Sequence, residues 1–218
     1  MTLQLKICGL STPETIAAAA DAGATHIGLV HFPKSPRHLD LEAAARLRRQ
    51  VPEGVKTVVL VVNPDGLTLA NIAQSVLPDV IQFHGEEPPE ALAAVKHEFK
   101  LDVWKALPVR SRASLDDSAI YDGIADRLLF DAPAPEGSAL PGGNGDAFDW
   151  SVLKGYPHRS PWALAGGLTP ANVAQAIRET GADFVDVSSG VESALPGERG
   201  IKDVDKIAAF CKAALAYD

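Results

Sequence analysis

Short runs of β-branched and aliphatic residues recur along this chain at roughly 25-residue intervals, separated by alanine-rich stretches with helical periodicity. Strands that alternate with helical crossovers form a parallel sheet, and eight such units close into a barrel. The sequence therefore predicts a single-domain (β/α)8 barrel, a TIM barrel, over residues 1–218. The eight predicted strands are residues 3–8, 26–30, 56–62, 80–83, 103–105, 127–130, 162–165 and 184–187.

The segments between the strands predict the helices of the barrel. Thr12 has the character of an N-cap, and Thr169-Pro170 would begin the helix after the seventh strand. The stretch 132–146, rich in proline and glycine, predicts a mobile loop over the site because two strands still follow it. An open doubly wound sheet is the alternative fold, although its glycine fingerprint does not follow the first strand. The predicted helices are residues 13–22, 41–49, 67–76, 89–98, 115–121, one beginning at 169–170, and 203–216.

Charge and cysteine content restrict the possible partners. A formal net charge of −8 over 218 residues argues against a nucleic-acid or anionic-membrane surface and leaves room for a local anion site. The two cysteines, Cys8 and Cys211, are too far apart to suggest a zinc site or a disulfide framework. We find neither a signal-peptide pattern nor an apolar run of membrane length, so a cytoplasmic protein is expected, either a monomer or a homodimer.

The first predicted strand ends at a thiol. Leu3, Leu5 and Ile7 alternate with more polar residues, and Gly9 then stops the strand directly after Cys8. Most free cysteines are small buried hydrophobes, which is the simple interpretation of Cys8. At the carboxyl end of a barrel strand, however, a thiol lies where such folds place their reactive groups.

Two glycine-containing turns follow the seventh and eighth predicted strands. Loops at these positions are where barrels most often bind a substrate phosphate. Glycine lets the backbone approach a ligand closely, and the start of a following helix favours an anion. Each turn alone is compatible with an ordinary tight turn, but together they predict a phosphate site. Its candidate residues are Gly166, Gly167, Asp186, Ser188, Ser189 and Gly190.

Three further side chains follow predicted strands and belong to the same candidate site. Asp131, after the sixth strand, could cap a turn or, opposite Cys8, act as a general acid. Arg37, in a loop stiffened by prolines, could bind a carboxylate with both terminal nitrogens or be a solvated surface residue. His84 could contact a ligand or have a structural role.

Seven motifs in this order give the chain a resemblance to the phosphoribosylanthranilate isomerase family of tryptophan biosynthesis, and they extend over nearly its whole length. The segment between Asp131 and Gly142 is somewhat longer than in that family. The motifs are Lys6-Ile7-Cys8-Gly9, Phe32-Pro33-Lys34-Ser35-Pro36-Arg37, Gln82-Phe83-His84-Gly85-Glu86, Leu129-Phe130-Asp131, Gly142-Gly143-Asn144-Gly145 with Phe148-Asp149-Trp150, Gly166-Gly167-Leu168, and Asp186-Val187-Ser188-Ser189-Gly190-Val191-Glu192.

The resemblance implies an Amadori rearrangement of a small phosphorylated substrate, from an aminoaldose to an aminoketose, without metal or cofactor. It implies that Asp131 is the general acid that protonates the furanose ring oxygen. It further implies that Cys8 is the general base that removes the proton from sugar C2. Arg37 would hold the anthranilate carboxylate, and the two late turns would hold the phosphate.

The alternation in the first strand also predicts an electrostatic partner for the thiol. Gln4, Lys6 and Cys8 share one face, which we expect to point into the barrel. Asp186, on the neighbouring eighth strand, could then pair with Lys6. A thiol is a poor base unless its thiolate is stabilised, and Lys6 is the predicted source of that stabilisation.

Two other functions remain open from the sequence. The sister isomerase of histidine biosynthesis performs the same rearrangement on a substrate with two phosphates. Resemblance to that family would imply two aspartates as the acid–base pair, where this chain has Cys8 and Asp131. A non-catalytic barrel that binds a phosphorylated metabolite would keep the phosphate turns without the acid and the base.

Overall fold

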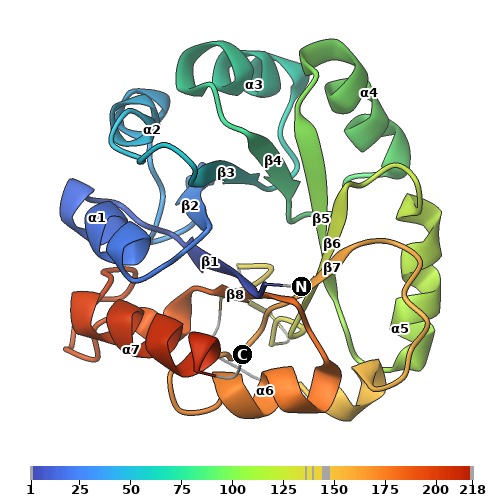
Figure 1. Cartoon of the computed structure of the whole chain (residues 1–218). Helices are drawn as coiled ribbons and strands as arrows, with labels where there is room; N and C mark the ends of the chain where they lie inside the picture. Colours follow the sequence, from blue (N-terminus) through green and yellow to red (C-terminus); the bar gives the residue numbers. More distant parts are fainter. Residues whose placement is uncertain (1, 136, 139, 144–147, 217–218) are drawn as a thin grey trace.

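The computed structural model describes residues 2–135, 137–138, 140–143 and 148–216, which form a closed parallel barrel. Each strand pairs with the next in sequence, and β8 returns to pair with β1, so the open-sheet alternative is excluded (Figure 1). The barrel predicted from the sequence is thereby confirmed. The strands are β1 (Gln4–Cys8), β2 (His26–Val30), β3 (Lys56–Val61), β4 (Val80–Phe83), β5 (Asp102–Pro108), β6 (Arg127–Asp131), β7 (Trp162–Leu164) and β8 (Phe184–Val187).

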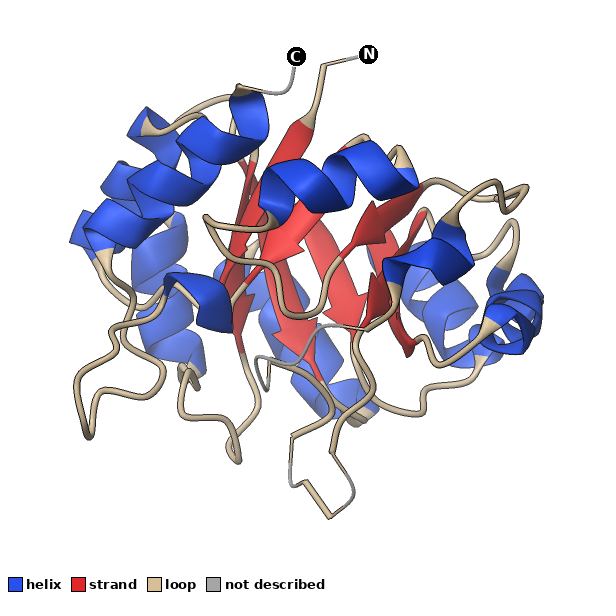
Figure 2. Cartoon of the chain, turned by 90° about the horizontal axis from the view of Figure 1, so that it is seen from below, coloured by secondary structure: helices blue, strands red, loops and turns tan. Residues whose placement is uncertain are grey.

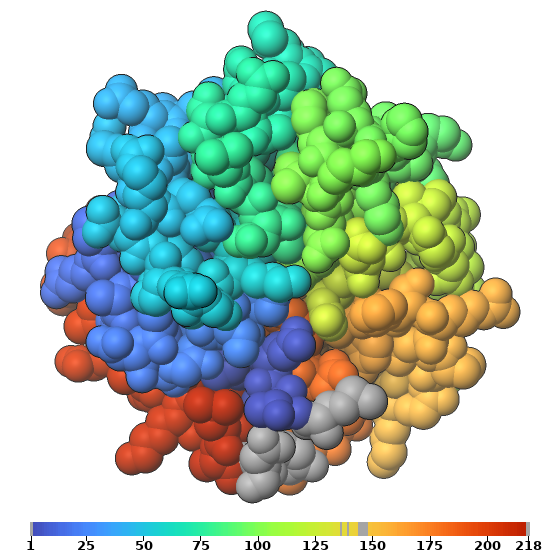
Figure 3. Space-filling model, turned by 45° about the horizontal axis from the view of Figure 1, so that its top comes forward, coloured from blue at the N-terminus to red at the C-terminus, as the bar shows by residue number. Residues whose placement is uncertain are grey.

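Helices surround the strands in sequence order, and the first and the last lie side by side (Figure 1). In the space-filling view, the blue N-terminal part of the surface accordingly adjoins the red C-terminal part (Figure 3). The sixth crossover contains only a short 3-10 turn among the residues that the structure describes. The helices are α1 (Pro13–Asp21), α2 (Leu41–Arg48), α3 (Gly66–Asn71) continued by the π-helical η1 (Ile72–Val76), α4 (Pro89–Phe99), α5 (Arg112–Asp117) continued by the 3-10 turn η2 (Ser118–Tyr121), η3 (Trp150–Leu153), α6 (Val173–Thr180), η4 (Ser189–Val191) and α7 (Val204–Leu215).

Local sequence signals explain where several helices begin. Thr12 forms a capping box with Thr15, in which each side chain bonds to the backbone of the other residue, and Pro13 occupies the first turn. Asp203 caps α7 by accepting hydrogen bonds from the two backbone N–H groups of Asp205 and Lys206.

The predicted start of the helix after β7 was wrong. Thr169-Pro170 lies in a turn, and α6 begins only at Val173. The Asn172 side chain holds this turn, since it accepts a hydrogen bond from the Thr169 N–H at 2.7 Å and donates one to the Gly167 carbonyl at 2.9 Å. The side-chain bonds of Asn172 thus compete with helix formation at these residues.

The core of the molecule has two layers. Apolar side chains of the outer strand faces pack against the helices, as Leu5 and Ile7 do. A smaller cluster fills the barrel interior and consists of Val58, Val80, Trp104, Ala106, Leu129, Ala163 and Phe184. Strand alternation separates the two layers, as a packed TIM barrel requires.

All strands point toward the same end of the barrel, and the loops that follow them gather there (Figure 2). Gly142 and Gly143, from the long loop after β6, line the pocket at this end. The rest of their predicted motif, Asn144-Gly145, and Asp146 of the predicted loop lie outside the described residues. In the described part of the chain, no helix is both long enough and apolar enough to span a bilayer.

We predict that Phe184→Ala destabilises the protein by about 3–5 kcal/mol, the usual cost of truncating a buried aromatic side chain. The Phe184 ring is fully buried, with the rings of His26 and Trp104 centred 4.9 Å and 5.4 Å away. The free energy of unfolding from urea titrations measures the effect. Ile120→Ala is the control, because that side chain is 61% exposed and its loss changes stability by at most about 0.5 kcal/mol. Equal losses in both variants would contradict this packing.

Candidate functional site

A pocket at the carboxyl ends of the strands collects nearly all residues that the sequence singled out. Of the ten predicted site residues, nine line it and Gly190 lies beside it. Gly190 packs against the Leu168 carbonyl and thereby joins the two late turns. The nine are Cys8, Arg37, His84, Asp131, Gly166, Gly167, Asp186, Ser188 and Ser189.

Cys8 lies above a buried ion pair inside the barrel. The register of β1 with β8 places Lys6 opposite Asp186, and the Lys6 ammonium donates to both carboxylate oxygens at 3.0 Å. The Lys6 side chain is fully buried. The predicted inward orientation of Lys6 and its pairing with Asp186 are therefore confirmed.

Room for this arrangement comes from a glycine on the neighbouring strand. Gly28 is the register partner of Cys8 on β2. A Cβ atom at Gly28 would lie 2.9 Å from the Cys8 Sγ and 3.1 Å from the Lys6 Cε. Gly28 was not among the predicted site residues, although a glycine within an apolar strand is a signal of such close approach.

Burial and charge oppose each other at the thiol. Burial raises the pKa of Cys8 above the ordinary value of a thiol, and the nearby Lys6 ammonium lowers it without cancelling that effect. Burial would lower the pKa of Lys6, but Asp186 and Cys8 together raise it, so the ammonium stays charged. The charge of Lys6 stabilises the Cys8 thiolate, but burial has the larger effect. In the ligand-free site at neutral pH, Cys8 is therefore mainly a thiol.

Asp131, at the end of β6, faces the pocket together with His84 from the end of β4. The Asp131 Oδ2 atom lies 3.3 Å from the His84 Nε2, and its Oδ1 accepts a hydrogen bond from the Ala132 N–H at 2.8 Å. Gly142 covers both groups, since a Cβ there would lie 2.5 Å from the carboxylate and 2.6 Å from the imidazole. His84 thus orients the carboxylate, and the loop backbone encloses it.

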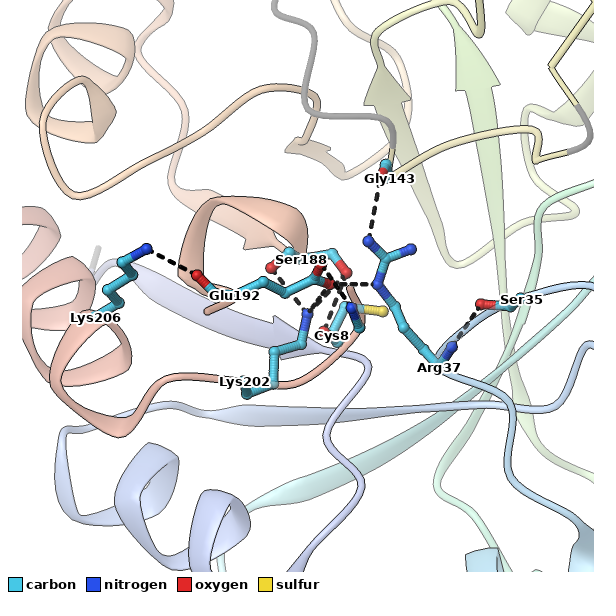
Figure 4. A network of polar contacts seen from close by, with 9 residues as sticks. Cys8, Ser35, Arg37, Gly143, Ser188, Glu192, Lys202 and Lys206 are labelled. Carbon is cyan, nitrogen blue, oxygen red and sulfur yellow. Dashed lines mark hydrogen bonds and ion pairs between the residues drawn. The ribbon is translucent and has the colours of Figure 1, made fainter. Parts of the chain in front are cut away.

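Arg37 is buried at the pocket wall and is not a solvated surface residue (Figure 4). Its Nε donates to the Glu192 Oε1 at 2.5 Å, and its Nη2 donates to the Gly143 carbonyl at 3.1 Å. Lys202 donates to the same Glu192 oxygen at 2.9 Å. Glu192 was predicted only as part of a family motif, without a role of its own, and nothing in the sequence around Lys202 signals its place here.

The two late turns form another wall of the pocket. Gly166 and Gly167 have φ values of 80° and 63°, a left-handed conformation that glycine adopts without strain. The 3-10 turn η4 follows Ser188, and α6 begins six residues after Gly167. The expected helix N-terminus is therefore not directly at the glycine turn, so any phosphate there would contact turn backbone and serine hydroxyls.

The remaining wall is apolar. Val30, Phe32, Leu60 and Val62, from β2, β3 and the loops that follow them, form one cluster with Cys8 and line the pocket. This wall suits an aromatic ring and offers no cation to a second phosphate. Within the described residues, no group of three or more His, Cys, Asp or Glu side chains is arranged to hold a metal ion.

We expect the reactivity of Cys8 toward a small alkylating agent to keep rising above pH 9, because burial raises the pKa of this thiol. The pH dependence of the Cys8 reactivity is measured as the rate of alkylation at each pH in the Cys211→Ala variant, in which Cys8 is the one remaining cysteine. Cys211 is buried on α7, where burial raises its pKa to about 11, so the Cys8→Ala protein is the slow control. A thiol that is half ionised near pH 7 would contradict this electrostatic description.

Glu192 should make the free energy of unfolding depend on pH in the acidic range. Its pKa is lowered from 4.5 to about 2, because Lys202 and Arg37 outweigh its burial. The carboxylate therefore stabilises the fold fully above about pH 4.5, and this contribution is lost as the pH falls toward 2. We predict that the difference in unfolding free energy between wild type and Glu192→Gln shrinks over this pH range. A constant difference in urea titrations from pH 5 to pH 2.5 would contradict the assignment.

Comparison with known proteins agrees with this geometry. An isomerase of Erythrobacter litoralis named N-(5'-phosphoribosyl)anthranilate isomerase is 59% identical over 210 residues, covering 96% of this chain and 97% of the relative. The crystal structure of phosphoribosyl anthranilate isomerase from Thermotoga maritima superimposes with a TM-score of 0.87 at 34% identity, over 99% of this chain and 100% of that one. A second structure of such an isomerase, in complex with reduced 1-(o-carboxyphenylamino)-1-deoxyribulose 5-phosphate, gives a TM-score of 0.84 at 32% identity over the same shares.

The family profile described as N-(5'phosphoribosyl)anthranilate (PRA) isomerase matches residues 5–213, which is nearly the whole chain. The match includes every residue assigned above to the pocket. This chain therefore belongs to the N-(5'-phosphoribosyl)anthranilate isomerase family.

Proposed function

We propose that this protein catalyses the isomerisation of N-(5'-phosphoribosyl)anthranilate to 1-(2-carboxyphenylamino)-1-deoxyribulose 5-phosphate in tryptophan biosynthesis. The observation that carries the proposal is the placement of Cys8 and Asp131 in one pocket between an apolar wall and two glycine turns. Residues 1–218 act as one catalytic domain in this proposal. The cytoplasm, where biosynthetic enzymes of this kind work, is the proposed location.

The reaction moves protons between neighbouring positions of one sugar. In the proposed mechanism, the Asp131 carboxyl protonates the ring oxygen, and the furanose opens to a Schiff base. The Cys8 thiolate then takes the proton from C2, which leaves an enolamine that tautomerises to the aminoketose. An acid and a base on different walls of one pocket suit such a transfer. Ala132 and His84, which both contact Asp131, hold its carboxyl group in place.

Neighbouring charges offset part of the cost of forming the thiolate. Burial disfavours the charged form of Cys8, while Lys6 and, more weakly, Lys202 favour it. A thiolate formed in this environment is a stronger base than an exposed one of ordinary pKa, because basicity rises with pKa. The proton of the Cys8 thiol can pass to solvent through the pocket before the substrate binds and closes the pocket.

Binding uses the other walls. Arg37 would face the anthranilate carboxylate, with its Nε already bonded to Glu192 and its terminal nitrogens on the side of the pocket. The aromatic ring would lie against Phe32, Leu60 and the neighbouring valines. The sugar phosphate would lie at Gly166, Gly167, Ser188 and Ser189, with Gly190 shaping the turn.

The same walls disfavour the two alternatives from the sequence. A second phosphate would have to lie beside the apolar wall, whose own side chains are uncharged, and would compete for Arg37. A barrel that only bound a phosphorylated metabolite would have no use for a buried Lys6–Asp186 pair beneath a thiol.

We predict that wild-type protein consumes freshly prepared phosphoribosylanthranilate, measured by the loss of its fluorescence. Cys8→Ala and Asp131→Asn should each lower kcat by about 10²–10⁴-fold, the usual contribution of a general acid or base. Cys211→Ala, which removes a thiol far from the pocket, should keep the wild-type rate.

Full activity in either of the first two variants would refute its assigned role. Turnover of the bisphosphorylated substrate of the histidine pathway at a comparable kcat/KM would refute the proposed specificity.

A further inference from the structure

Two charged residues beside the pocket have no part in the proton transfers. Glu192 lies just after η4, and Lys202 lies just before α7; both are buried, with 8% and 6% of their surface exposed. An antiparallel bridge pairs the backbones of these two residues. Buried charges are retained in proteins only where they are paired, so their partners indicate what they do.

The Glu192 carboxylate contacts two other segments, the loop that carries Arg37 and the stretch 200–202 (Figure 4). Its Oε1 accepts hydrogen bonds from the Arg37 Nε at 2.5 Å and the Lys202 Nζ at 2.9 Å. Its Oε2 accepts one from the Gly200 N–H at 3.0 Å. Two cations thus share the Oε1 atom, and a backbone N–H group fixes the Oε2 atom.

This contact determines which part of Arg37 faces the pocket. With Nε bonded to Glu192, the terminal nitrogens remain on the side of Gly143 and the pocket. The aliphatic part of Arg37 packs on Gly9, where a Cβ would lie 2.7 Å from the Arg37 Cδ and 3.4 Å from the Lys202 Cε. An arginine held at both its stem and its Nε loses little rotamer freedom when it binds a carboxylate.

Lys202 extends the network to the phosphate turn and the first strand. Its ammonium donates to the Ser188 carbonyl at 2.9 Å and lies 3.2 Å from the Ser188 hydroxyl. That hydroxyl donates to the Cys8 carbonyl at 3.2 Å. One carboxylate–ammonium pair therefore connects the residues proposed for the carboxylate, the phosphate and the base.

The charge of the network also fits an anionic ligand. Arg37 and Lys202 bring two positive charges and Glu192 brings one negative charge, which leaves one positive charge unmatched. Burial, together with Arg37, lowers the pKa of Lys202 to about 8, and Glu192 and Cys8 oppose that change. A substrate carboxylate on Arg37 supplies the missing negative charge.

We propose that Glu192 and Lys202 are positioning residues for substrate recognition: they hold Arg37 so that its terminal nitrogens bind the carboxylate of the substrate. This role rests on the proposed function for its substrate, but the fixed arginine itself is a property of the pocket. Neither residue touches the reacting atoms, so both act through Arg37 and Ser188.

A double-mutant cycle between Glu192→Gln and Arg37→Met tests the proposal. In the wild-type background, Glu192→Gln should raise KM about tenfold or more with little change in kcat, because a charge-assisted contact that orders the arginine is lost. In the Arg37→Met background the same substitution should change KM by less than about twofold, since residues that act as a unit are not additive.

The cycle is also measured by the equilibrium binding of anthranilate, followed by its own fluorescence, with aniline as the probe that lacks the carboxylate. Glu192→Gln should weaken anthranilate binding and leave aniline binding unchanged. Lys206→Met is the matched control, because the Lys206 Nζ donates to the Glu192 backbone carbonyl at 2.8 Å and not to its carboxylate, so both KM and binding should stay at wild-type values.

Equal KM or affinity changes from Glu192→Gln in both backgrounds would overturn the positioning role. If Glu192→Gln does not fold, Glu192→Asp keeps the charge and shortens its reach, and the same non-additivity is expected. Non-additive anthranilate binding in a protein without turnover would leave the positioning role standing and refute the proposed function. Turnover together with additive effects of the two substitutions would refute the positioning role and leave the proposed function standing.

Discussion

The site depends on one buried ion pair inside the barrel. A lysine ammonium without a partner would not remain charged in a closed, apolar interior, and the Lys6 ammonium is held there by both oxygens of Asp186 at 3.0 Å. The register of β1 with β8 fixes this pair, and Gly28 on β2 leaves space for it. Cys8 lies one inward position above Lys6, so the charge state of the pair determines the environment of the thiol.

Closure of the barrel then explains how distant segments form one pocket. Cys8 and Asp131 come from β1 and β6, which are not neighbours in the sheet, and they meet only because all strands open onto the same end. Positive-φ glycines and close backbone contacts shape the loops around them. At Gly142, the absence of a side chain allows the long loop after β6 to cover the Asp131 carboxylate.

The sequence was most informative where periodicity or strand position determines the outcome. Strand alternation predicted the inward face of β1 and the Lys6–Asp186 pair, and the positions of strand ends predicted the pocket. The start of α6 was mispredicted because the bonds of Asn172 to Gly167 and Thr169 are local tertiary detail that a Thr-Pro signal does not contain. Lys202 could not be found, since its partners lie on segments that only the folded chain brings together.

The central claim is that the Lys6–Asp186 pair, taken as a unit, lowers the pKa of the base. The pH dependence of kcat/KM in the double variant Lys6→Met/Asp186→Asn tests it most directly, because removing both partners leaves no unpaired buried charge. The favourable effect of Lys6 on the Cys8 thiolate is larger than the opposing effect of Asp186. We therefore predict that the rising limb on the acidic side of the profile, which reports ionisation of the base, moves to higher pH. A profile that coincides with that of the wild type would contradict the claim.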